Sequence, residues 1–148
     1  MTATELEHYL HTYLPLTNAM QISVLSASAD KLVLQAPLAP NINPHQTVFG
    51  GSLAAIGTLA AWCLVYNNLE QAGIKNNLVI RRSSLEYERS IAGDFTASAQ
   101  FVDTAQWAAF IPTLLEKGKS RIEVETLLEY NNTIGVRFKG EFVALKAN

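Results

Sequence analysis

Alternation of apolar and polar residues dominates the second half of the 148-residue chain. A period of two places successive side chains on opposite faces of a strand, so it predicts strands with one buried face. Such strands are typical of antiparallel sheets. In the first of them, Val79, Leu85 and Tyr87 are expected on the buried side, and Asn131–Asn132 is predicted to join the last two as a tight hairpin. The four predicted strands cover residues 77–91, 93–102, 120–130 and 133–146.

One segment between these strands lacks the alternation. Residues 103–118 carry an apolar face at helical spacing, with Asp103 or Thr104 as a cap and Gly118 as a stop. Pro112 is expected to split this helix or to mark a restart, because proline removes a helical hydrogen bond.

The first part of the chain predicts a short helix followed by two short strands. The helix covers residues 4–14, where Thr4 can cap it, Glu7 follows three residues later and Pro15 stops it. The strands are predicted over residues 22–28 and 31–37.

A long helix is predicted over residues 51–71, with Gly73 placed to end it. Its many alanines make it thin, which suits a sheet that curls closely around it. Gly57 costs helix propensity, about 1 kcal/mol relative to alanine, so the close approach of another backbone is expected there.

This helix raises the question of a membrane span, because residues 32–69 contain no charged side chain. Residues 48–66 would suffice in length to cross a bilayer. They include three glycines and many weakly apolar alanines, and no basic flank lies nearby to set an orientation. A helix that is apolar all round also suits a protein interior, so we expect a buried helix and no membrane.

Composition narrows the class of protein. A length of 148 residues favours a single domain, residues 1–148. The net charge of −2 gives no reason to expect nucleic acid as a partner. The single cysteine, Cys63, excludes an internal disulfide and any CxxC metal site, and its apolar neighbours predict a packing role. Because the first residues lack the pattern of a signal peptide, the cytoplasm is the expected location.

The predicted order is a helix, two strands, one long buried helix, and four strands with a helical excursion. A single antiparallel sheet of five to six strands around the long helix accounts for this order, which is an α+β fold. With “HQTVFGGSLAAIGTLAAW” leading into the helix, the chain resembles the hotdog fold from about residue 20 to residue 146.

The resemblance extends to a particular family, the YiiD C-terminal type of thioesterase domain. It rests on “FGGSL”, on “SIAGDF”, and on Trp107 followed by “GKSRIEV”. Hotdog thioesterases have an asparagine several residues before a glycine pair, and Asn43 and Gly50–Gly51 match that pattern. The resemblance implies an acyl-CoA or acyl-carrier thioesterase without a cofactor, in which coenzyme A enters only as part of the substrate. It also implies a homodimer or homotetramer with sites at the interface between chains.

Thioester cleavage develops negative charge on the carbonyl oxygen. Backbone N–H groups at a helix N-terminus can stabilise such an oxyanion, because they point outward and carry partial positive charge. The resemblance makes the Gly50 N–H the expected donor and places Phe49, Gly51 and Ser52 in the substrate site. From the residues alone, the glycine pair could serve only the turn into the helix, and Ser52 is expected to cap it.

The general base is less evident from the sequence. Related hotdog thioesterases carry an acid about two turns after the glycine pair, where this chain has Thr58. Threonine can orient a water but cannot take its proton near neutral pH. His45 is the leading alternative, since histidine titrates near neutrality, and Asn43 could orient the water or the carbonyl. Glu86 and Glu88 are further candidates, although exposed strand carboxylates are common.

Other groups give weaker indications. Arg81 and Arg82 could bind the phosphates of coenzyme A, and they could equally be a solvated strand face. His8 and His11 lack a third ligand, so no metal site is expected.

Two alternatives to a thioesterase remain at this point. One is an acyl-thioester hydratase or dehydratase, which needs a histidine together with an acid. The other is a non-catalytic acyl-binding domain, which the threonine at position 58 would favour.

Overall fold

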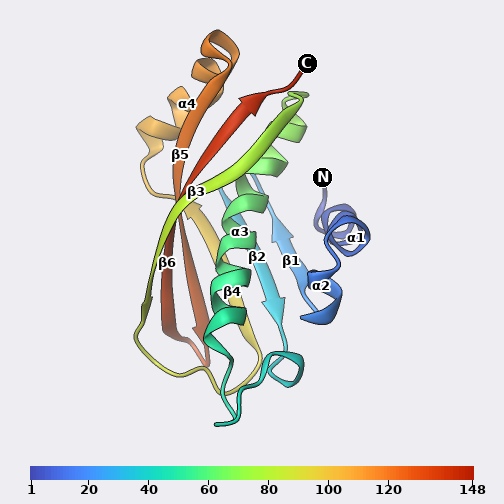
Figure 1. The fold of residues 1–148 in the computed structure, drawn as a ribbon, viewed down its shortest axis with the longest axis vertical. Coiled ribbons are helices and arrows are strands. Elements are labelled where there is room, and N and C mark those ends of the chain that lie inside the picture. The colour runs from blue at the N-terminus through green and yellow to red at the C-terminus, as the bar shows by residue number, and fades with distance from the viewer.

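A six-stranded antiparallel sheet curves around one long helix in the computed structural model, which describes residues 1–148 (Figure 1). The strand order across the sheet is β1-β2-β4-β5-β6-β3. This arrangement confirms the predicted α+β architecture. The strands are β1 (Ser23–Ala27), β2 (Lys31–Ala36), β3 (Asn76–Tyr87), β4 (Phe95–Phe101), β5 (Lys119–Tyr130) and β6 (Thr133–Lys146).

Of the five helices, three lie within one or two residues of their predicted bounds, and the two short ones, at residues 16–19 and 39–41, were not predicted. They are α1 (Ala3–Tyr13), α2 (Leu16–Ala19), the short 3₁₀ helix η1 (Ala39–Asn41), α3 (Gly50–Gln71) and α4 (Thr104–Lys117). α3 lies against one face of the sheet, and α1 and α2 lie beside β1 (Figure 1).

The predicted cap of α1 was wrong by two residues. Thr2, not Thr4, is the N-cap, and it exchanges hydrogen bonds with Glu5 in a capping box. Hydrogen bonding to Thr2 lowers the pKa of the Glu5 carboxyl. Glu7 instead accepts a hydrogen bond from the backbone N–H of Val24 at 2.7 Å, which attaches α1 to β1.

α3 is the core helix of the fold. Its length and composition would allow it to span a membrane, but most of its apolar window is packed inside the protein. Its Cys63 is fully buried, as the apolar neighbours predicted, and burial raises the pKa of the Cys63 thiol.

Gly57 allows α3 to lie close to the sheet. A Cβ at this position would lie 3.2 Å from the Cβ of Phe138 on β6. The close approach predicted from the sequence is therefore present, but the neighbour is a side chain and not a backbone. The hydroxyl of Thr126 on β5 donates a hydrogen bond to the Gly57 carbonyl at 2.9 Å, within the buried core.

Replacement of Thr126 by valine is expected to lower the free energy of unfolding by about 1 kcal/mol, because it removes one buried hydrogen bond between helix and sheet. Urea denaturation followed by circular dichroism measures the change. Thr96→Val on β4 is the matched control, since the Thr96 hydroxyl makes no hydrogen bond within the chain. Equal losses in the two variants would show that the contact to Gly57 contributes nothing.

Strand β3 departs from its predicted pattern in two ways. It ends at Tyr87, where residues to 91 were expected to continue it. The register against β6 also shifts between Ile80 and Arg82, so a bulge adds one residue there. As a result, Leu78 and Leu85 share the face toward α3, and Val79 lies on the opposite face with 53% of its surface exposed.

Helix α4 is continuous through Pro112, which corrects the predicted break. Asp103 caps its start through the N–H groups of Ala105 and Gln106, and Gly118 ends it with φ = +75°. Phe110 on one side of the proline and Leu114 on the other are both buried. Packing on both sides offsets the one lost hydrogen bond.

The hairpin between β5 and β6 forms as predicted. Asn131 and Asn132 have φ values of +53° and +59°, the left-handed pair that a two-residue turn with the twist of the sheet requires.

Candidate functional site

The loop before α3 is organised by Asn43. An isolated bridge pairs Ile42 with Val48 and closes the loop. The Oδ1 atom of Asn43 accepts hydrogen bonds from the backbone N–H groups of His45 (2.9 Å) and Thr47 (3.2 Å). Its Nδ2 atom donates to the Thr47 hydroxyl at 2.9 Å. The Asn43 amide therefore holds the loop in shape and is already occupied within the chain.

The start of α3 has no side-chain cap. Phe49 occupies the N-cap position, and the first hydrogen bonds of the helix run from the N–H groups of Ser52 and Leu53 to the Phe49 carbonyl. No group in the chain accepts a hydrogen bond from the N–H of Gly50 or Gly51. The expectation that Ser52 caps the helix was wrong, because Ser52 lies inside its first turn.

These two free donors create a site for negative charge. The first N–H groups of a helix point along the axis and carry the positive end of its dipole. The first turn of α3 contains no acidic residue that would offset this charge. The start of α3 can therefore stabilise an anion or a carbonyl oxygen that becomes one.

A surface hollow of about 310 Å³ lies beside this helix start, and we call it the Gly50 hollow. The last residue of β3 and the segment after it form the second wall, and the Tyr87 hydroxyl donates to the Gly50 carbonyl at 3.3 Å. Glu88 is the only acidic residue of the hollow and Arg89 the only basic one. The lining residues are Asn43, Thr47, Val48, Gly50, Leu53, Tyr87, Glu88, Arg89, Ser90 and Ile91.

The Glu88 carboxylate is held from one side. Nε of Arg137 on β6 contacts its Oε1 atom at 2.6 Å, and both side chains are partly exposed. No hydrogen bond within the chain occupies the other carboxylate oxygen. The structure thus places Glu88 among the residues that line the same hollow as Gly50 and Asn43.

Of the four catalytic candidates from the sequence, His45 and Thr58 lie outside the Gly50 hollow; the predicted substrate residues Phe49, Gly51 and Ser52 do not line it either. His45 is exposed, and its ring makes no hydrogen bond within the chain. The Thr58 hydroxyl donates to the Ala54 carbonyl of its own helix at 2.8 Å. Within one chain, Thr58 and Gly50 therefore face different cavities.

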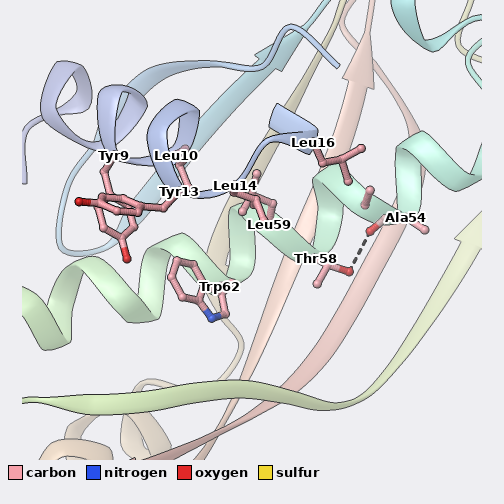
Figure 2. A pocket seen from close by; sticks show the side chains of 10 residues that line it. Tyr9, Leu10, Tyr13, Leu14, Leu16, Ala54, Thr58, Leu59 and Trp62 are labelled. Atoms are coloured by element: carbon pink, nitrogen blue, oxygen red, sulfur yellow. Dashed lines mark hydrogen bonds between the residues drawn. The ribbon is translucent and has the colours of Figure 1, made fainter. Parts of the chain in front are cut away.

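Thr58 lines a second cavity, a groove of about 610 Å³ between α1–α2 and α3 (Figure 2). We call it the α1–α3 groove. Nine of its ten lining residues are aliphatic or aromatic, and Thr58 is the exception. The lining residues are Tyr9, Leu10, Tyr13, Leu14, Leu16, Ala54, Ala55, Thr58, Leu59 and Trp62.

The arginines of β3 are not brought to the Gly50 hollow. Arg81 forms an ion pair with Glu141 at 2.8 Å, and its hydrogen bond lowers the pKa of the Glu141 carboxyl. Arg82 pairs in register with Glu141 and lies five residues before Tyr87, a distance of about 16 Å along a strand. No group of three or more His, Cys, Asp or Glu residues is placed to hold a metal ion.

Comparison with known proteins identifies relatives of the chain. A family model described as “Putative thioesterase (yiiD_Cterm)” matches residues 3–146. A crystal structure of a protein of unknown function from Chlorobaculum tepidum TLS is 30% identical, covers 98% of this chain and 94% of that chain, and has a TM-score of 0.89.

Two further structures share the architecture. One is described as a “putative thioesterase” from Shewanella oneidensis, with 27% identity, coverage of 97% of this chain and 96% of that chain, and a TM-score of 0.85. The other is a thioesterase from Haemophilus influenzae, with 12% identity, coverage of 99% and 92%, and a TM-score of 0.78. At that low identity the last comparison shows the fold alone. Together the comparisons confirm the predicted hotdog fold.

Proposed function

The chain belongs to the family described as “Putative thioesterase (yiiD_Cterm)”, and from that premise we propose that it hydrolyses an acyl-CoA or acyl-carrier thioester at the start of α3. Family and fold support a thioesterase-like function. The position of the reaction, the residues that carry it and the substrate belong to the proposal.

One observation carries this proposal: the unpartnered N–H groups of Gly50 and Gly51 at the positive end of a 22-residue helix. A thioester carbonyl oxygen placed there accepts two hydrogen bonds as it becomes an oxyanion. Donors fixed before the reaction need no reorganisation, which makes such sites effective in acyl transfer.

Glu88 is the proposed general base. Water attacks the carbonyl carbon and forms the new C–O bond while Glu88 accepts its proton. The tetrahedral oxyanion binds to the helix start, the C–S bond breaks, and the leaving thiolate takes the proton back. The products are a carboxylic acid and a free thiol.

The remaining residues take supporting roles in this proposal. Asn43 holds the loop, and therefore the approach to Gly50, in its observed shape. Arg89, the one cation of the Gly50 hollow, is suited to an anionic part of the thiol carrier. His45 could act only if its ring turned toward the substrate from its exposed position.

We further propose that two copies of the chain pair along β3. This twelve-residue strand is an edge of the sheet, whereas the opposite edge strand, β1, is covered by α1. Val79 and Tyr87 are each more than half exposed on β3. A long, uncovered edge strand with apolar side chains is suited to pairing with another strand.

Light scattering of the purified chain is expected to give at least twice the 16.2 kDa mass of one chain. Val79→Lys is expected to reduce this mass, because it places charge in the proposed contact. Leu25→Lys on β1, which is about as exposed, is the control. A monomeric wild-type chain would contradict pairing along β3.

The activity is tested by thiol release from a panel of acyl-CoA thioesters. Release that saturates with substrate supports the proposal. Saturable binding without thiol release from any member of the panel would instead indicate a non-catalytic acyl-binding domain. Hydration of an enoyl-CoA double bond without thiol release would indicate a hydratase.

A further inference from the structure

We infer that the α1–α3 groove binds the hydrocarbon chain of an acyl thioester, and that an aromatic cluster at its far end limits the chain length. The inference rests on the proposed function for the identity of the thioester. It adds a binding surface that includes the N-terminal helices. It also names a substrate class, thioesters of apolar acyl groups of limited length.

The groove lies on the face of α3 that begins at Gly51, whereas Gly50 itself lines the Gly50 hollow. Gly51, Thr58 and Trp62 are separated by seven and four residues, a spacing that places them on one face of a helix. Ala54, at the near end of the groove, lies one turn beyond Gly50. From Gly51 to Trp62 the axis rises about 16 Å, so an acyl chain attached to a carbonyl at the helix start can run along it.

The lining of the groove suits hydrocarbon and nothing more polar. No charged side chain lines it, and its one aliphatic hydroxyl, on Thr58, is already bonded to the Ala54 carbonyl. Tyr13 is 71% exposed and Leu16 is 53% exposed along its α1–α2 side. An acyl chain would remove this apolar surface from water, which is favourable in proportion to the area covered.

Aromatic rings lie at the far end of the groove. Tyr66 stacks on Trp62 with ring centroids 4.4 Å apart and on Tyr9 at 5.4 Å, and Tyr13 lies against Tyr9. The Trp62 Nε1–H donates to the Leu78 carbonyl of β3 at 2.9 Å. Figure 2 shows Tyr9 and Tyr13 at the end away from Ala54. Because these rings are held by several contacts, we infer that they limit how far an acyl chain extends along the groove.

The α1 side of the groove is also fixed to the fold. Glu7 accepts the Val24 N–H, and His11 Nε2 contacts the Ile22 carbonyl at 2.7 Å. The side-chain amide of Asn67 on α3 donates to the Met1 carbonyl at 3.0 Å. The groove is therefore formed before a ligand arrives, which reduces the entropic cost of binding.

Binding is tested separately from turnover, with S-alkyl coenzyme A thioethers from ethyl to hexadecyl, which cannot be hydrolysed. Isothermal titration is expected to show affinity rising roughly fourfold with each added methylene, the gain for burying one CH₂. The rise is expected to end at a limiting length, where the chain meets the aromatic wall. Affinity that does not depend on chain length would overturn the inference.

Ala54→Leu fills the near end of the groove and is expected to abolish the gain in affinity with chain length. Ala108→Leu on the exposed side of α4 makes the same substitution away from the groove and should retain the gain. Circular dichroism confirms that both variants fold. A retained gain in folded Ala54→Leu would place the acyl chain elsewhere.

The two proposals fail in different ways. Binding that depends on chain length, without thiol release, would support the acyl-binding groove and contradict the proposed thioesterase activity. Thiol release without binding that depends on chain length would support the thioesterase activity and contradict the acyl-binding groove. If Ala54→Leu lowers the mass of the assembly instead, the groove is covered by a second copy of the chain, and the inference is wrong.

Discussion

Glu88→Gln is expected to lower kcat for thiol release by about 10²–10⁴-fold, the usual contribution of a general base. Glutamine has the shape of glutamate and can still accept the hydrogen bond from Arg137, so the wall of the Gly50 hollow is preserved. It cannot take a proton from water. Steady-state release of coenzyme A measures the effect.

Glu86→Gln is the matched control. Glu86 lies on the same segment and pairs in register with Arg137, but it does not line the Gly50 hollow. Thiol release at saturating substrate is expected to be retained in Glu86→Gln and lost in Glu88→Gln. Equal activities of the two variants would assign the base elsewhere, and His45→Ala in the same series would then test the exposed histidine.

Gly50→Pro is expected to lower kcat by about 10²–10³-fold, as removal of one oxyanion donor does in other acyl-transfer enzymes. Proline has no N–H, so the substitution deletes the proposed donor directly. The fold accepts proline here because Gly50 is the first residue of α3, a position that proline favours. Phe49 has φ = −58° and ψ = 132°, the extended conformation that a residue before proline adopts. Thiol release at saturating substrate measures the loss.

The alternation of side chains was sufficient to predict the sheet, but local ambiguities were resolved only by packing. Val79 and Ile80 are both apolar, so the pattern could not show which of them faces α3. The bulge at Arg81, which reverses the alternation between them and Leu85, is not visible in the sequence. Thr2 and Thr4 are each followed by a glutamate three residues later, so both satisfied the rule for a capping box. In each case tertiary contacts selected one of two locally equivalent arrangements.

Only part of the candidate site could be predicted from the sequence. Asn43 and Gly50 lie in one continuous motif, and the structure keeps them in one hollow. Glu88 was a weak candidate, because alternation alone treats it as an exposed strand residue. Its place in the lining of the Gly50 hollow depends on where β3 ends and on the contact from Tyr87 to α3.

The α1–α3 groove could not be anticipated at all. It combines residues 9–16 with residues 54–62, and only the docking of α1 against α3 brings them together. The same geometry explains the environment of Thr58. The position that carries an acid in related thioesterases here faces an apolar groove, where a charged carboxylate would be costly to bury.

The most direct test of the account is the ratio of kcat between Gly50→Ala and Gly50→Pro on the same thioester. Alanine keeps the N–H, and its Cβ would lie 3.6 Å from the Tyr87 ring, an ordinary contact. The two variants therefore differ mainly in the proposed oxyanion donor. The account predicts a ratio of about 10²–10³, with both proteins folded. A ratio near one would contradict the account, because it would show that the Gly50 N–H takes no part in the reaction.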